Sequence, residues 1–384
     1  MKTKNRRTLP TLLVAVIVIM LLPGLACNLF SAQPEEPEVV EEPVVVEEPE
    51  VIEEPELEVE PAFRPEQVLR LDFEEKVSSV AFSNDGDLIA TGINNQADIW
   101  RVVDGSLVQS FEVQNSVDGL VFLPGDDAIA MGINVWHVYI FDVASGEEQS
   151  FLDKRGYDHS LALSPDGTRI ASGNRDGITL LWDMSTGELI MELDPMEIVD
   201  TYAAYISDQV SPPTSKWLTA IAYSPDGRIV AVGHTTGYIF LWDANSGELI
   251  RTIEPEIDFS AVRSLAFSAD GQYLAVGGRR HEGQEVIKAI QVSDGSLAYV
   301  LDQYTGGGSG SAPVTYSPDG TLLAAGATDG IYIWSLPDYE LLHTIPIEDT
   351  GDSDWVTDLA FSPDSQYLLA GYWNDYAILW QVQE

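Results

Sequence analysis

The sequence predicts an all-β protein, a seven-bladed β-propeller that follows an export segment and an acidic linker. The first observation is a four-residue turn that occurs seven times. The second is the spacing of successive turns, 40, 41, 60, 44, 49 and 45 residues, which indicates a repeated unit with insertions in some copies. The third is that each unit contains four short runs typical of strands. The turn reads SPDG at 164–167, 224–227 and 317–320, with variants at 83–86, 123–126, 268–271 and 362–365.

The copy around residue 224 shows how one unit is organised. "LTAIAY" leads through "SPDG" into "RIVAVG", and "YIFLWD" leads through "ANSG" into "ELIRTIE". Pro225 suits the second position of a type I turn, and Gly227 accepts the positive φ that closes the hairpin. The first three strands are apolar almost throughout, while the fourth alternates. Blades stacked around an axis produce this gradient, because their inner strands are covered on both faces and their outer strands lie half in water.

The units resemble the repeats of WD-repeat β-propellers. "ASGNRDGITLLWD" (171 to 183) is close to that family's pattern, and "LWD" recurs at 241 to 243. The resemblance covers nearly all of residues 66–384. It implies that the tryptophan of each unit is structural and lies in the core between blades, with Phe141 and Ile290 in its place in two units. The tryptophans are Trp100, Trp182, Trp242, Trp334 and Trp380.

The units depart from the family pattern in one respect. The Gly-His pair that many members carry before the first strand is absent. The family's buried His–Ser–Asp–Trp hydrogen-bond network is therefore expected to be at most partial. In the third unit, Ser172, Asp176 and Trp182 match three of its four members.

The last unit is one strand short. "VTDLAFSPDSQYLLAGYWNDYAILWQVQE" contains three strands, and the segment before the first unit, "EQVLRLDF" (66 to 73), looks like an outer strand. An open edge of unpaired backbone groups is an aggregation hazard, so pairing is strongly favoured. We expect residues 67–73 to pair beside residues 376–382 and to close the ring.

Residues 1–26 are interpreted as a signal peptide or membrane anchor. Four basic residues precede the apolar run "LLVAVIVIMLL" (12 to 22), and small residues lead to Cys27. "LPGLAC" resembles the lipobox of bacterial lipoproteins, although Leu25 lies two residues before the cysteine where three is usual. The resemblance implies lipid on Cys27 and an extracytoplasmic, membrane-anchored location in the cell envelope. Ordinary cleavage that leaves a free thiol, and an uncleaved anchor over residues 12–30, stay open.

Residues 27–65 are interpreted as a linker. Proline recurs every six residues from 37 to 61 among acidic residues and valines, with no basic residue between 33 and 62. Repeated proline blocks helix formation and like charges repel, so the segment is expected to be an extended spacer before the propeller of residues 66–384. An acidic docking strip for a basic partner is the alternative.

Four insertions are expected on one face of the ring, because connections from outer to inner strands and from second to third strands share a face in this fold. They are residues 195–216, where a helix is expected, 278–285, 302–313 and 346–355. Irregular segments gathered on a rigid scaffold are typical of a binding surface. The partner-binding candidates are Arg279, Arg280, His281, Tyr202, Tyr205 and Trp355. The alternative for the two arginines is that they pair with neighbouring acids such as Glu282 and Glu285.

The composition limits the chemistry. With one cysteine, neither a disulfide framework nor a zinc cluster can form within the chain. A formal net charge of −43 disfavours nucleic acid and anionic lipid, so membrane contact is expected only through the N-terminal anchor. The five histidines show no ligand spacing, and no catalytic or cofactor-binding residue is predicted. Asp349, Asp352 and Asp354 are a candidate cation site, since they offer oxygen ligands without the spacing of an EF-hand loop.

The sequence therefore predicts a monomeric protein-binding or scaffold module of the cell envelope. Two alternatives remain: a propeller hydrolase or lyase that uses acids near the axial mouth, and a receptor for a small ligand or glycan. Convergent Asp, Glu, His or Arg side chains around the axial opening would indicate an enzyme, whereas exposed aromatic side chains on the loop face would indicate binding.

Overall fold

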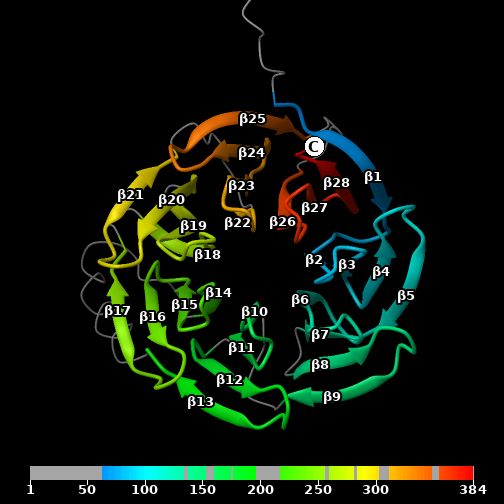
Figure 1. Ribbon diagram of the computed structural model, residues 1–384, viewed down its shortest axis with the longest axis horizontal. Helices are drawn as coiled ribbons and strands as arrows, with labels where there is room; N and C mark the ends of the chain where they lie inside the picture. Colours follow the sequence, from blue (N-terminus) through cyan, green and yellow to red (C-terminus); the bar gives the residue numbers. More distant parts are fainter. Residues whose placement is uncertain are drawn as a thin grey trace, which may run out of the picture. The chain divides into compact units, whose positions relative to one another are not determined.

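Seven four-stranded antiparallel sheets are arranged radially around a central axis (Figure 1). The computed structural model describes the residues from 63 to 383 apart from 134–136, 153–159, 174–175, 196–216, 256–258, 281–282, 302–310 and 348–353. All of these described residues belong to one compact unit, Glu60–Glu384. They contain strands and turns but no helix. The predicted all-β, seven-bladed propeller is confirmed.

Each blade runs from an innermost to an outermost strand. Blade 1 contains β2 (Ser79–Phe82), β3 (Leu88–Ile93), β4 (Gln96–Arg101) and β5 (Leu107–Glu112), and blade 2 contains β6 (Val117–Phe122), β7 (Ala128–Ile133), β8 (His137–Asp142) and β9 (Glu148–Leu152). Blade 3 contains β10 (Ser160–Leu163), β11 (Arg169–Gly173), β12 (Thr179–Asp183) and β13 (Leu189–Leu193), and blade 4 contains β14 (Leu218–Tyr223), β15 (Ile229–His234), β16 (Ile239–Asp243) and β17 (Leu249–Ile253). Blade 5 contains β18 (Phe259–Phe267), β19 (Tyr273–Arg280), β20 (Glu285–Gln291) and β21 (Leu297–Val300), and blade 6 contains β22 (Val314–Tyr316), β23 (Leu322–Gly326), β24 (Gly330–Ser335) and β25 (Glu340–Pro346). Blade 7 contains β26 (Val356–Phe361), β27 (Tyr367–Tyr372) and β28 (Tyr376–Gln381), with β1 (Glu66–Asp72) as its outermost strand.

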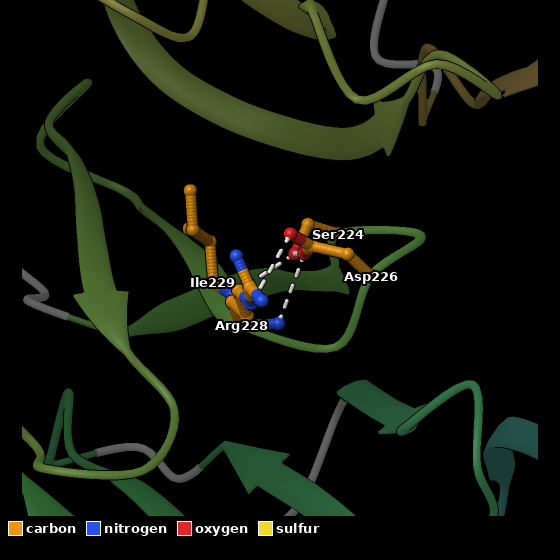
Figure 2. A network of polar contacts seen from close by, with 4 residues as sticks. All are labelled: Ser224, Asp226, Arg228 and Ile229. Atoms are coloured by element: carbon orange, nitrogen blue, oxygen red, sulfur yellow. Dashed lines mark hydrogen bonds and ion pairs between the residues drawn. The ribbon is translucent and has the colours of Figure 1, made fainter.

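The S-P-D-G turn is held by its own side chains, as Figure 2 shows for blade 4. The Ser224 hydroxyl donates to Asp226 Oδ1 at 2.6 Å and accepts from the Ile229 amide at 2.9 Å. Asp226 Oδ1 also accepts from the Arg228 amide at 3.0 Å. Gly227 has a φ of 70°, the left-handed conformation that glycine adopts without steric cost. The turn is thus specified locally, which explains why four residues of sequence are enough to locate each hairpin.

The N-terminal strand closes the ring as expected. β1 pairs antiparallel with β28, and Leu71 lies opposite Ala377 (Figure 1). Leu71 is buried and packs in the same apolar cluster as Val77 of the neighbouring blade. Closure therefore satisfies the backbone groups of β28 and buries apolar side chains between blades 7 and 1.

The tryptophan of each unit lies on the third strand, opposite an apolar residue of the second. Trp182 donates from Nε1 to Ser172 Oγ at 3.1 Å, and Trp100 donates to Thr91 Oγ1 at 3.1 Å. In blades 4, 6 and 7 the indole nitrogen is buried without a hydrogen-bond partner among the described residues. Among the described residues, the expected polar network is thus seen as one tryptophan hydrogen bond in each of blades 1 and 3.

The structure corrects one predicted boundary on the loop face. Residues 278–285 were expected to form a loop, but β19 continues through Arg280 and β20 resumes at Glu285. Arg279 lies opposite Glu285 in this ladder. The helix expected within 195–216 falls almost entirely outside the described residues. Over the described part of the chain, no helix has the length and apolar character needed to cross a membrane.

Candidate functional site: the axial mouth

A hollow of about 370 Å³ opens at the axis on the face that carries the connections from outer to inner strands. We call this side the loop face, and the side that carries the S-P-D-G turns the turn face. The hollow is called the axial mouth, and its lining comes from all seven blades except blade 3. Lys76, Ser78, Asp118, Trp217, Leu218, Thr219, Arg263, Ser311, Thr357 and Trp373 line it.

Two tryptophans give the axial mouth exposed aromatic surface. Trp217 and Trp373 are each 38% exposed, whereas tryptophan side chains are highly buried on average in folded proteins. Trp373 stacks on Trp355, with ring centroids 4.2 Å apart and an interplanar angle of 23°. Lys76 Nζ lies 4.5 Å from the centroid of the Trp373 ring, a cation–π distance. The indole pair is therefore a built platform and not a mobile side chain.

A buried carboxylate fixes the segment that carries this platform. Asp354 Oδ1 accepts from the amides of Trp355 and Asn374, at 2.8 Å and 3.1 Å. Its Oδ2 accepts from the Tyr376 hydroxyl at 2.8 Å. The Trp373 amide in turn donates to the Trp355 carbonyl at 3.0 Å. These bonds connect the entry of β26 to the β27–β28 turn, so the two indoles are held face to face.

The charged side chains of the axial mouth include both signs. The Arg263 side chain is exposed to the channel. Desolvation by the surrounding protein lowers the pKa of its guanidinium, the positive charge of Arg279 lowers it further, and the negative charge of Glu285 raises it. A guanidinium stays charged at neutral pH despite such a shift. The Asp118 carboxylate accepts from the Ser116 hydroxyl at 2.6 Å. The mouth thus combines apolar platforms with a few polar groups, as binding pockets commonly do.

Below the axial mouth the channel wall is polar, and its side chains join neighbouring blades. Ser160 Oγ accepts from the Ile221 amide at 3.1 Å, and Ser264 Oγ accepts from the Val314 amide at 3.1 Å. Asp358 Oδ2 accepts from the Val80 amide at 2.9 Å across the closure between blades 7 and 1. Desolvation by the surrounding protein raises the pKa of the Asp358 carboxyl to about 6, although the hydrogen bonds from the Val80 and Leu359 amides lower it. These side chains accept hydrogen bonds from the backbone of the neighbouring blade, so their role is to hold adjacent blades together.

The predicted candidates have different locations. Trp355 lies beside the axial mouth as the partner of Trp373. Arg279 and Arg280 end β19, and Arg279 Nε donates to the Gly283 carbonyl at 3.3 Å. Asp354 is 7% exposed and engaged as described above. The other candidates, His281, Tyr202, Tyr205, Asp349, Asp352 and Cys27, lie outside the described residues.

The residues that the sequence analysis missed are Lys76, Trp217, Arg263 and Trp373. Trp217 ends the longest insertion and Trp373 lies in the turn between second and third strands of blade 7, so their places in the repeat already assign both to the loop face. Both tryptophans lie outside the third-strand position that the repeat reserves for tryptophan, and this departure from the repeat could have indicated a role in binding. Within the described residues, no group of three or more His, Cys, Asp or Glu side chains is placed to hold a metal ion.

Comparisons with known proteins give partial matches along the propeller. The family described as WD domain, G-beta repeat matches residues 65–100, 159–183, 247–281 and 340–381. The WD40 domain of anaphase-promoting complex subunit 4 matches residues 209–259. A small ribosomal subunit protein RACK1z of Oryza sativa subsp. japonica is 33% identical over 127 residues, which is 32% of this chain and 32% of that protein. THO complex subunit 3 of Arabidopsis thaliana is 27% identical over 232 residues, 53% of this chain and 73% of that protein. The chain spans about a third of the length of the two RACK1 relatives from Oryza sativa subsp. japonica.

Proposed function

We infer that this chain, as a WD40-repeat propeller, is a protein-binding or scaffold module that captures its partner at the axial mouth. Proteins of this repeat family typically serve as interaction modules, which supports the class of function. The single observation that carries the site is the exposed indole surface of Trp217 and Trp373. Interface hot spots are enriched in tryptophan, tyrosine and arginine, and the axial mouth presents two of these three types.

A binding experiment with matched variants tests this proposal. The full chain is used to capture partners from the envelope fraction of its source cells. Trp217→Ala and Trp373→Ala should each weaken capture by about 2 kcal/mol, the usual loss at an aromatic hot spot. Leu107→Ala, which truncates an apolar side chain 52% exposed on an outer strand, is the control and should leave capture unchanged. Equal capture by all three variants at unchanged melting temperature would place the interface elsewhere.

A small ligand or glycan is the second candidate, because indole faces beside hydroxyl groups suit a sugar ring. Ser78 and Ser311 bring hydroxyl-bearing side chains to the same hollow. Protease treatment of the envelope fraction distinguishes a protein partner from a small ligand or glycan. Capture that survives proteolysis but is lost in Trp373→Ala would assign the axial mouth to a glycan instead of a protein.

We further propose that the propeller is displayed outside the cytoplasm on a lipid-anchored stalk. The apolar run at 12–22 and the "LPGLAC" sequence before the acidic linker support this. Mass spectrometry of the mature N-terminus is the direct measurement. Diacylglyceryl modification of Cys27 is expected, and Cys27→Ser should release the cleaved chain from membranes. An unmodified Cys27 or an intact Met1 would contradict lipidation.

A further inference from the structure

A second hollow lies on the turn face, between blades 5 and 6, where no sequence motif indicates a site. Its volume is about 260 Å³, large enough for one long side chain. Tyr273 of blade 5 and Tyr339 of blade 6 line it, together with Pro337. Asp270 and Asp319, the aspartates of two neighbouring S-x-D-G turns, complete the lining. We call this hollow the tyrosine pocket.

Tyr339 occupies a turn position that other blades give to glycine. Five other outer turns place glycine two residues before the outer-strand residue that lies opposite the repeat's tryptophan position, as Tyr339 is two residues before Leu341, and each glycine has a φ between 67° and 76°. These glycines are Gly105, Gly146, Gly187, Gly247 and Gly295. Blade 6 has Tyr339 there with a φ of 56°, a left-handed conformation that costs energy for a residue with a side chain. Such strain persists where the side chain is needed.

The Tyr339 ring is fixed by other tyrosines. Its hydroxyl lies 2.7 Å from the Tyr316 hydroxyl, and its ring centroid lies 4.2 Å from that of Tyr299. Tyr273 meets it at 79° with centroids 6.3 Å apart. Burial raises the pKa of Tyr339 to about 12, and the nearby Asp270 carboxylate is among the lesser causes of the rise. The pocket therefore has rigid, neutral aromatic walls beside a negative charge.

Asp270 and Asp319 both bring a carboxylate to the pocket, but they differ in how their oxygens are engaged. Asp270 Oδ1 accepts from the Ser268 hydroxyl at 2.6 Å and from the Gln272 amide at 2.9 Å. These two bonds orient the carboxylate, and among the described residues Oδ2 accepts none. Asp319, in contrast, uses both oxygens, since Thr321 Oγ1 donates to Oδ1 at 2.9 Å and to Oδ2 at 3.0 Å. Asp270 thus keeps one oriented oxygen for a ligand.

We propose that the tyrosine pocket is a binding site for an arginine side chain of a protein or peptide, separate from the axial mouth. A guanidinium is the group that both pairs with a carboxylate and packs on aromatic rings. The pocket offers both, in a chain whose formal net charge of −43 attracts basic ligands and repels anionic ones. The site does not depend on the function proposed for the loop face.

The equivalent place between blades 7 and 1 provides a matched position for Asp270 and for Tyr339. Asp364 Oδ1 accepts from Ser362 Oγ at 2.6 Å and from the Gln366 amide at 3.0 Å, as Asp270 does in its own turn. The outer turn beside it, in blade 1, contains Gly105 where the tyrosine pocket has Tyr339. The same turn chemistry is therefore present at this place without the tyrosine from the neighbouring blade.

The test uses the full chain with isotope-labelled tyrosine rings and two probes, Nα-acetyl-argininamide and its neutral isostere Nα-acetyl-citrullinamide. The arginine probe should shift the NMR signals of Tyr273 and Tyr339, and the citrulline probe should not. Asp270→Asn should weaken the arginine probe about fivefold, the loss expected for a partly exposed ion pair. Asp364→Asn should leave its affinity unchanged.

Tyr339→Gly supplies the second variant, because it restores the residue that five other turns use and removes the aromatic wall. It should fold and lose the saturable shift of the Tyr273 signal. The proposal is overturned if the citrulline probe binds as tightly as the arginine probe, if Asp364→Asn weakens binding as much as Asp270→Asn, or if folded Tyr339→Gly binds as well as the unchanged protein.

Discussion

Among individual residues, the repeat tryptophans show how one side chain can be used in two ways. Trp182 donates to Ser172, whereas Trp242 has Val232 at the place of that serine, and its buried Nε1 has no partner among the described residues. An unpaired buried donor costs free energy, while a paired one contributes about 1 kcal/mol net. In both blades the indole stabilises the core by its shape and its buried apolar area. In blade 3 it also forms a hydrogen bond, which is missing in blade 4.

Replacing each of these tryptophans by phenylalanine should therefore have unequal effects. Both changes remove similar apolar area, because the two side chains are 3% and 7% exposed. Trp182→Phe also leaves the Ser172 hydroxyl without its donor, whereas Trp242→Phe removes an unsatisfied N–H. The free energy of unfolding in urea should fall by about 1–2 kcal/mol more for Trp182→Phe. An equal or larger loss for Trp242→Phe would show that the hydrogen bond does not stabilise blade 3.

Asp358 makes stability depend on pH. Its folded pKa of about 6 lies above the ordinary value of 3.8. Between these values the unfolded chain has lost the proton while the folded protein retains it, so the free energy of unfolding falls as the pH rises from about 4 to 6. A shift of this size would change the free energy of unfolding by about 3 kcal/mol for a fully buried group. The Asp358 carboxylate is only half-buried and contacts channel water, so the change should be smaller.

Asp358→Asn should remove this dependence while an oxygen still accepts from the Val80 amide. His234 acts in the opposite direction, since burial lowers its pKa to about 4. Between about pH 6.5 and 4 the unfolded chain binds a proton at this histidine while the folded protein does not, so the free energy of unfolding falls as the pH falls through this range. Urea unfolding of both proteins across this range is the measurement. The variant should gain stability relative to the unchanged protein as the pH rises to about 7. A difference that stays constant with pH would contradict the assignment to Asp358.

At the level of elements, the sequence was most informative where structure is specified locally. In the blade 4 turn the Ser-Asp bond and the closing glycine lie within six residues, and this local pattern, with variants, was enough to predict the hairpins and the missing strand of blade 7. Residues 278–285 were misassigned because strand β19 extends beyond the repeat, which depends on pairing with the long β18. The stacking of Trp373 on Trp355 and the packing of Tyr339 on Tyr299 join distant or irregular segments, and no local pattern encodes such contacts.

Removing β1 tests whether closure is needed for stability. A chain that begins at residue 76 lacks the strand that pairs with β28, and loses Leu71 from the cluster around Val77. The exposed edge should cause association, and the melting temperature should fall by several degrees, since each kilocalorie per mole is worth about 1–2 °C in a domain of about 320 residues. A chain that begins at residue 63 is the control. Equal melting temperatures with both chains monomeric would mean that β1 contributes little to the ring.

At the scale of the whole molecule, the described residues form a closed ring and the chain has a strong excess of negative charge. It has 62 acidic residues against 19 Lys and Arg. Turn aspartates such as Asp226 stay ionised, because the hydrogen bond from Ser224, followed by that from the Arg228 amide, lowers the carboxyl pKa. The Asp226 carboxylate thus accepts hydrogen bonds within its own turn, while the sum of the carboxylate charges is repulsive over the ring.

Added salt should consequently stabilise the fold while slowing capture of a basic partner. Raising the ionic strength from about 0.01 M to 0.15 M shortens the Debye length from about 30 Å to 8 Å, so the carboxylates repel one another less and the melting temperature should rise by a few degrees. Choline chloride at equal ionic strength should act like sodium chloride if general screening is the cause. The same screening weakens long-range attraction, so the association rate with a basic partner should fall. A melting temperature that falls with both salts would show that favourable ion pairs, and not self-repulsion, dominate the electrostatics of the ring.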